Sequence, residues 1–105
     1  MNTTKEGSHE TVVRVCSTGG NEPLQFEVVV QDGSGATLHQ VTMSKSDFER
    51  LSQRRATAEE CVRAAFLFLL DREPKESILR RFDVSVIGRY FPDFVRDFPH
   101  YRDRK

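Results

Sequence analysis

The segment TAEECVRAAFLFLL, residues 57–70, decides the fold. Thr57 is followed three residues later by Glu60, which is the capping-box pattern of a helix start. On a helical wheel the apolar residues of this segment cover more than half of the circumference: Cys61, Val62, Ala65, Phe66, Leu69 and Leu70, extended by Ala64 and Phe68. So wide an apolar face needs more than one neighbour, and we expect this helix to lie between a sheet and the C-terminal region.

Three segments upstream of this helix have the composition of strands. TVVRVC, residues 11–16, is β-branched and runs into a cluster of turn-forming residues. Residues 24–31 alternate in polarity, with Leu24, Phe26, Val28 and Val30 on one face. Residues 37–43 resume a β-rich pattern after Asp32-Gly33-Ser34-Gly35. These patterns predict an antiparallel β-hairpin, within a three-stranded meander.

Short helices are predicted on both sides of the central helix. Ser44 and Asp47 form a near capping box, with Phe48 and Leu51 facing inward. Pro74 ends the central helix, Asp83 is suited to cap a helix over residues 84–91, and Pro92 is suited to begin a last one. The predicted fold is therefore α+β: a hairpin or three-stranded meander, a central amphipathic helix, and two or three short C-terminal helices.

The length of 105 residues is that of one domain. Residues 1–10 have no apolar periodicity after Met1, and we expect them to form a disordered tail. The α+β domain is expected over residues 11–100, with a frayed C-terminus at residues 101–105.

The overall charge gives no indication of a partner. Sixteen basic and sixteen acidic side chains balance, in a chain that is 37% hydrophobic and 30% charged. This is an ordinary globular composition and unlike that of a strongly basic nucleic-acid-binding protein. No apolar run approaches the roughly 18 residues of a membrane span, and the first ten residues lack the apolar stretch of a signal peptide. We expect a soluble cytoplasmic protein without a membrane partner.

No catalytic or metal-binding motif stands out. Cys16 lies before a glycine-containing loop, but the position where a phosphatase loop has arginine is Glu22, which would repel phosphate. Neither His39, for which we expect a surface or cross-strand role, nor His9 or His100 has a partner at a familiar ligand spacing. Cys16 and Cys61 are expected to be buried and unpaired, although sequence leaves their pairing open. We therefore predict no enzymatic activity, cofactor or metal, and an enzyme using His39 or Cys16 is a third-ranked hypothesis.

Aromatic residues are concentrated in the C-terminal part of the chain. Eight of the ten Phe and Tyr residues lie between Phe66 and Tyr101, interleaved with arginines. The simplest interpretation is an aromatic core patch beside a face of paired charges, because Asp83, Asp93, Asp97 and Asp103 alternate with those arginines.

Three motifs in this region resemble those of a known protein family. The motifs are EPKESIL at residues 73–79, FDVSVI at 82–87 and RYFPDF at 89–94. They are similar to the C-terminal series of a family of small uncharacterised bacterial proteins, and the resemblance extends from Leu24 to Phe94. It implies a bacterial, cytoplasmic hairpin-plus-helices domain. The family has no established activity, so it assigns no site residue.

Two functional hypotheses follow. The first is a non-enzymatic interaction domain, in which a sheet edge or the C-terminal aromatic residues contact a protein partner or a second copy of the chain. Its candidate residues are Tyr90, Phe91, Phe94 and Phe98. The alternative is a nucleic-acid-binding regulator using Arg80, Arg81 and Arg89, presented by the short helices. The neighbouring aspartates oppose that alternative.

Overall fold

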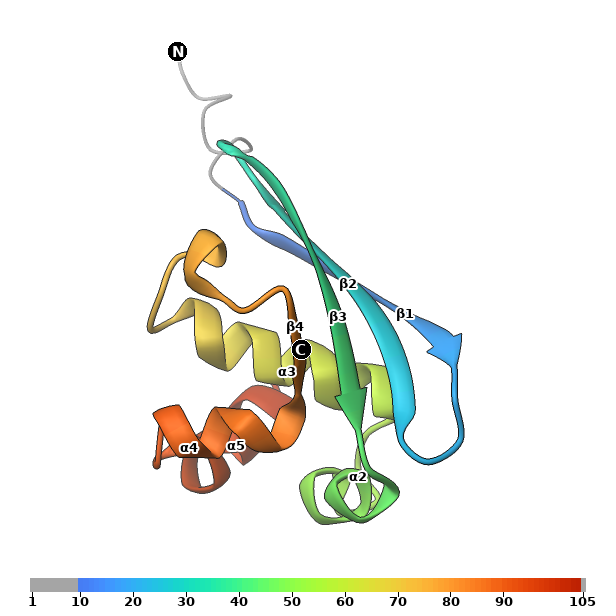
Figure 1. Ribbon diagram of the computed structural model, residues 1–105. Helices are drawn as coiled ribbons and strands as arrows, with labels where there is room; N and C mark the ends of the chain where they lie inside the picture. Colours follow the sequence, from blue (N-terminus) through green and yellow to red (C-terminus); the bar gives the residue numbers. More distant parts are fainter. Residues whose placement is uncertain (1–9, 105) are drawn as a thin grey trace.

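The computed structural model describes residues 10–104, and of the expected tail at residues 1–10 all but Glu10 lies outside the described residues. Figure 1 shows a long twisted sheet packed on helices. The strands are β1 (Val12–Gly19), β2 (Leu24–Asp32), β3 (Gly35–Met43) and β4 (Arg81–Asp83). The helices are α2 (Lys45–Ser52), α3 (Ala58–Leu70), η1 (Lys75–Ser77), η2 (Val84–Val86), α4 (Ile87–Tyr90) and α5 (Phe94–Arg102). The α+β layout predicted from the sequence is confirmed.

The sheet has the order β1-β2-β3-β4. β1, β2 and β3 form the predicted antiparallel meander, in which Val28 pairs with Val15 on one side and His39 on the other. The alternation read from the sequence is also confirmed in β2, because Phe26, Val28 and Val30 are buried and Gln25 and Gln31 are exposed. One face of the sheet is thus apolar and packs on α3.

The capping box of α3 forms as predicted. The Thr57 hydroxyl accepts a hydrogen bond from the Glu60 amide at 3.1 Å, and the Glu60 carboxylate accepts one from the Thr57 amide at 2.8 Å. Val62, Phe66 and Phe68 are fully buried, since α3 packs against the sheet on one side and against α5 on the other. The wide apolar face of this helix is therefore the centre of the core.

The sequence missed the fourth strand. β4 pairs with β3 in parallel over only three residues, from Gln40–Arg81 to Thr42–Asp83. Such a short segment has no recognisable period of its own, and the parallel partner lies far away in the sequence.

The helices after β4 also differ from the prediction. Asp83 caps η2 as expected, accepting from the Ser85 amide at 3.0 Å, but the helix predicted over 84–91 divides into η2 and α4. α5 begins at Phe94 instead of Pro92.

The C-terminal boundary differs as well. α5 continues to Arg102, and Tyr101 is buried and donates a hydrogen bond to the Asp71 carboxylate. The predicted fraying from residue 101 is therefore wrong for Tyr101 and Arg102. Both belong to α5, and the Tyr101 ring is part of the core. In the described chain, no helix is both long and apolar enough to cross a membrane.

Candidate functional site

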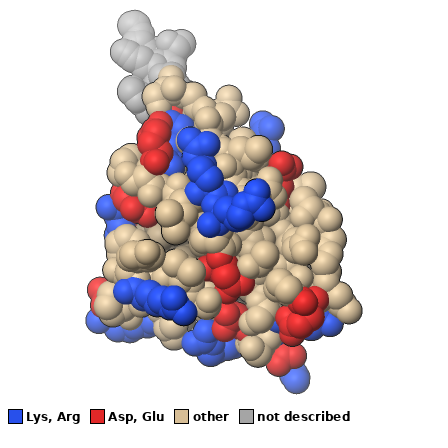
Figure 2. Space-filling model, in the orientation of Figure 1, with Lys and Arg blue, Asp and Glu red and all other residues tan. Residues whose placement is uncertain are grey.

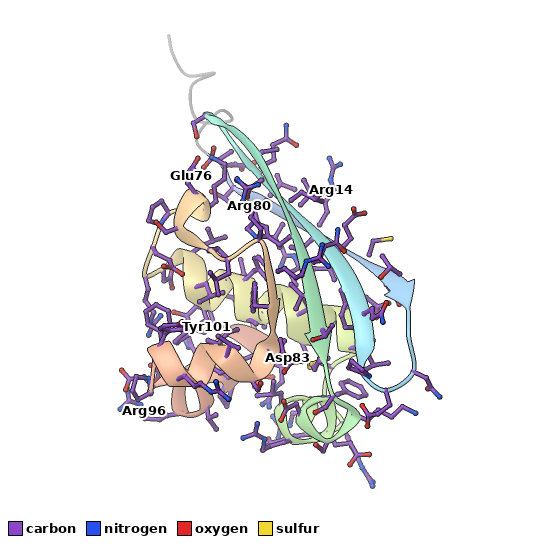
Figure 3. The ribbon with its side chains drawn as sticks, in the orientation of Figure 1. Arg14, Glu76, Arg80, Asp83, Arg96 and Tyr101 are labelled. Carbon is purple, nitrogen blue, oxygen red and sulfur yellow. The ribbon has the colours of Figure 1, made fainter. Side chains whose placement is uncertain are left out.

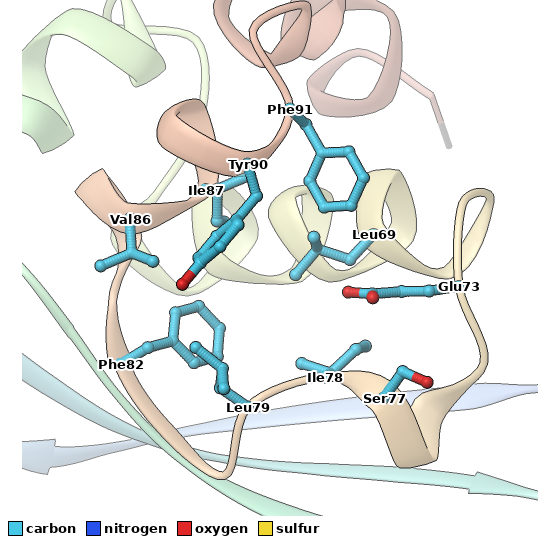
Figure 4. Close-up of a pocket in the computed structure, with 10 residues that line it drawn as sticks. All are labelled: Leu69, Glu73, Ser77, Ile78, Leu79, Phe82, Val86, Ile87, Tyr90 and Phe91. Carbon is cyan, nitrogen blue, oxygen red and sulfur yellow. The ribbon is translucent and has the colours of Figure 1, made fainter.

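A pocket of about 280 Å³ lies between the end of α3, the segment leading to β4, and α4 (Figure 4). We call it the α3–α4 pocket, and it is lined by Leu69, Glu73, Ser77, Ile78, Leu79, Phe82, Val86, Ile87, Tyr90 and Phe91. Seven of these side chains carry no polar atom. Its polar groups are the Glu73 carboxylate and the hydroxyls of Ser77 and Tyr90, and none of the lining residues is basic. A concave apolar site with a few polar groups is the usual form of a binding site.

The mouth of the pocket exposes large apolar side chains. Tyr90 is 69% exposed and Leu79 is 49% exposed, although each also lines the cavity. Large apolar side chains exposed together beside one cavity mark a contact site more often than single exposed residues do.

Glu73 is the one charged residue of the pocket. It follows the last turn of α3, where its amide donates to the Leu69 carbonyl at 2.9 Å, and its carboxylate points into the cavity beside Leu69 and Ile78 (Figure 4). Over residues 10–104 its side chain has no hydrogen-bond or ion-pair partner. Burial of this carboxylate beside apolar side chains raises its pKa, because desolvation disfavours the charged form.

One wall of the pocket is held by the buried residue Lys75. Its ammonium group donates to the Asp32 carboxylate at 2.8 Å, to the Ser34 hydroxyl at 2.7 Å and to the Glu76 carboxylate at 2.6 Å. The bonds to Asp32 and Ser34 join η1 to the end of β2 and the turn that follows it. They lower the pKa of Asp32 to about 2, chiefly through the bond from Lys75, and they raise the pKa of Lys75. Sequence reasoning missed Lys75, because lysine is rarely buried and nothing in the sequence marks this one.

His39 holds the same wall at its other end. The ring Nδ1 lies 2.7 Å from the Leu79 carbonyl oxygen and Nε2 lies 2.8 Å from the Thr37 hydroxyl. A carbonyl only accepts, so Nδ1 carries the proton and Nε2 accepts from Thr37. The ring is fully buried, with its centroid 5.2 Å from that of Phe66. Of the expected surface or cross-strand role of His39, the surface alternative is wrong: His39 lies on the inward face of β3, and its ring holds the Leu79 carbonyl.

The structure divides the four aromatic candidates into two pairs. Tyr90 and Phe91 line the pocket. Phe94 and Phe98 are only 3% and 1% exposed and pack against each other in the core, with ring centroids 5.3 Å apart. The prediction that Phe94 and Phe98 contact a partner is therefore wrong. Their spacing places them on one face of α5, and that face packs on α3.

The three candidate arginines are exposed, but only one of them lies on a short helix as expected. Arg80 precedes β4, Arg81 is in β4, and only Arg89 is in a helix, α4. Arg80 and Asp83 lie at the two ends of β4 (Figure 3), and Figure 2 shows acidic and basic side chains interspersed on this face. Elsewhere the expected charge pairing is present: Arg72 and Arg96 both pair with Asp97, and Arg102 with Asp103.

The two cysteines are unpaired. Cys16 is exposed on β1 and Cys61 is buried in α3, so the expectation of burial is wrong for Cys16, which lies on the uncovered face of the sheet. Burial raises the pKa of the Cys61 thiol to about 11. Among the described residues, no cluster of three or more His, Cys, Asp or Glu side chains is placed to hold a metal ion.

Comparison of the chain with family models, with curated proteins and with solved structures finds no match. The residues that line the α3–α4 pocket are concentrated in one part of the sequence. Every lining residue except Leu69 falls in the segments 73–79, 82–87 and 89–94. These three segments surround one cavity.

Proposed function

We propose that this domain is a non-enzymatic protein-interaction module that accepts one side chain of a partner segment in the α3–α4 pocket. The observation that carries the proposal is an apolar cavity with Leu79 and Tyr90 exposed at its mouth. A cavity of about 280 Å³ is at the small end of the range for ligand sites, which suits a single anchoring side chain better than a large cofactor.

The support of the pocket wall favours binding. Lys75 and His39 hold residues 75–79 at two points, and the Gln40 amide donates to the Arg80 carbonyl at 2.8 Å. A wall held in this way is already ordered before a partner arrives, so less conformational entropy is lost on binding. Aromatic residues such as Tyr90 are also enriched among the residues that dominate binding energy.

The two residues considered as catalytic candidates, His39 and Cys16, do not form part of the lining of the α3–α4 pocket. Both ring nitrogens of His39 are used in buried hydrogen bonds. Cys16 is exposed on β1.

A peptide selection tests the proposal. Random peptides displayed on phage are selected on the whole protein, and the enriched peptides are synthesised and their binding measured by calorimetry. We expect Leu79→Asp to weaken the binding of these peptides at least about tenfold, because a charge at the mouth of the pocket must be desolvated on binding. Val95→Asp is the matched control, since Val95 is also 49% exposed but lies on α5 outside the pocket. Peptides that bind both variants equally well, or no enrichment at all, would overturn the proposal.

Two other outcomes would replace it. Salt-sensitive binding of DNA or RNA oligomers that is lost in Arg80→Gln would support the nucleic-acid alternative. Self-association, seen by light scattering over a dilution series and abolished by Leu79→Asp, would make the partner a second copy of the chain.

A further inference from the structure

We infer that the side chain accepted by the α3–α4 pocket is an organic cation on an apolar stem, namely an arginine or lysine of the partner segment. This inference rests on the proposed function and adds the chemistry of the anchoring residue. It starts from Glu73, the only charged group among the residues that line the cavity.

A neutral or anionic occupant is disfavoured by Glu73. An apolar side chain that filled the cavity would remove the remaining water from a carboxylate that has no partner among the described residues, and burying an unpaired charge is costly. An anionic occupant would add repulsion. A guanidinium or ammonium group would supply hydrogen bonds and the opposite charge, which offsets that desolvation.

The rest of the lining fits the same cation. The rings of Phe82, Tyr90 and Phe91 line the cavity, and aromatic faces attract guanidinium and ammonium groups. The Ser77 hydroxyl is a further acceptor on the wall. Leu69, Ile78 and Ile87 supply apolar surface for the methylene stem of arginine or lysine. A carboxylate, aromatic rings and an aliphatic lining together match a charged head on an apolar stem.

The first test uses small probes of matched shape. N-butylguanidinium is titrated into the ¹⁵N-labelled protein and its binding followed from the amide shifts of Ser77, Leu79 and Tyr90. N-butylurea is the neutral isostere and pentanoate the anionic probe. A fragment of this size binds with a Kd on the order of 1 mM. We expect N-butylurea and pentanoate to bind at least about tenfold more weakly than the cation.

Variants assign the preference to Glu73. Glu73→Gln should bind N-butylguanidinium and N-butylurea about equally, whereas Glu49→Gln, an exposed change on α2, should keep the wild-type preference. With the described part of the chain the side chain of Glu73 makes no hydrogen bond or ion pair, so Glu73→Gln should fold, and circular dichroism checks that it does. Equal binding of the cation and the urea by the wild type, or no binding of either, would overturn the inference.

The selected peptides separate this inference from the proposed function. They should share one arginine or lysine. Replacing a shared arginine by the neutral isostere citrulline should weaken peptide binding to the wild type at least about tenfold, but should leave peptide binding to Glu73→Gln unchanged. Peptides that depend on Leu79 but carry no shared basic residue would refute the cation and leave the interaction module standing. Peptides that bind Leu79→Asp as tightly as the wild type would refute the interaction module itself.

Discussion

His39 shows how one buried polar side chain can support a site it does not enter. It is fully buried, yet both ring nitrogens have partners, so its burial leaves no polar group unsatisfied. Burial lowers the pKa of His39, and the nearby positive charge of Arg80 lowers it further. The folded protein therefore holds His39 neutral at pH values where the unfolded chain takes up a proton.

This difference predicts a loss of stability in mild acid. Because the folded pKa of His39 lies below the ordinary 6.5, its contribution is complete above about pH 6.5 and is lost as the pH falls toward the folded pKa. The free energy of unfolding should fall by up to about 1.4 kcal/mol per pH unit in this range. Urea unfolding between about pH 7 and pH 5 measures it. His39→Gln should flatten the dependence and the exposed His100→Gln should keep it, so equal slopes in all three proteins would contradict the prediction.

The two thiols should differ sharply in reactivity. Cys16 is exposed, whereas Cys61 is buried and its pKa is raised to about 11, so at mildly alkaline pH it remains a protonated, inaccessible thiol. A thiol reagent such as Ellman's should modify one cysteine of the folded chain quickly and the second only after unfolding. Cys16→Ser should remove the fast phase, and two cysteines reacting at one rate in the folded wild type would show the prediction to be wrong.

Among the elements, α3 depends on the reciprocal bonds at its N-terminus. Thr57→Ala removes the hydroxyl that accepts from the Glu60 amide and leaves that amide without a protein partner. Loss of such a cap costs about 0.5–2 kcal/mol of unfolding free energy. Thr11→Ala is the matched control, since Thr11 is exposed ahead of β1. Urea unfolding compares the two, and equal stability of both variants would mean that the capping box does not stabilise α3.

The elements that could be predicted are those with a periodic pattern. α3 and the meander were predicted because their apolar spacing repeats over many residues. The cap of α2 was predicted because Ser44 stands three residues before Asp47, and the Ser44 hydroxyl does accept from the Asp47 amide at 3.0 Å. β4 could not be predicted, because three residues show no period and their pairing depends on β3, which lies far away in the sequence.

The candidate site was predicted only in part. Tyr90 and Phe91 were identified because aromatic residues are dense near them, but the same signal selected Phe94 and Phe98, which belong to the core. Lys75 and His39 were missed as positioning residues, since their partners are Asp32, Ser34 and a backbone carbonyl brought close only by the fold. Periodicity identifies buried faces, and it gives no information on which polar side chains meet.

In the whole molecule, the hairpin and the pocket are mechanically connected. At the turn between β2 and β3, Asp32 and Ser34 accept hydrogen bonds from the Lys75 ammonium group. Lys75 belongs to η1, which continues directly into the pocket wall at Ser77–Leu79. The position of the wall thus depends on a turn some 40 residues earlier in the chain. Binding in the pocket should therefore respond to changes at a residue that does not line it.

Lys75→Met tests this connection. Methionine can fill the space of the buried stem, but Asp32 and Glu76 then lose their cationic partner, and removing one partner of a buried ion pair destabilises a fold. The unfolding free energy is therefore expected to fall whether or not Lys75 holds the wall, so it is not the decisive readout. Instead, amide hydrogen exchange of residues 76–80 should accelerate, because the wall loses one of its supports and keeps those from His39 and the Gln40 amide. Peptides that bind in the pocket should bind at least about threefold more weakly, as the wall must then be ordered on binding.

The carboxylate of Asp32 gives an independent measure of the same support. Its pKa of about 2 lies below the ordinary 3.8, so the stabilisation it provides is complete above about pH 4 and is lost as the pH falls toward 2. In Lys75→Met the main cause of that shift is gone, and a carbon-detected NMR titration should show the pKa of Asp32 returning toward 3.8. Lys45→Met, an exposed change on α2, should leave it near 2. If Asp32 still titrates near 2 in Lys75→Met and the exchange of residues 76–80 is unchanged, Lys75 does not hold the wall, and the hairpin and the pocket are independent.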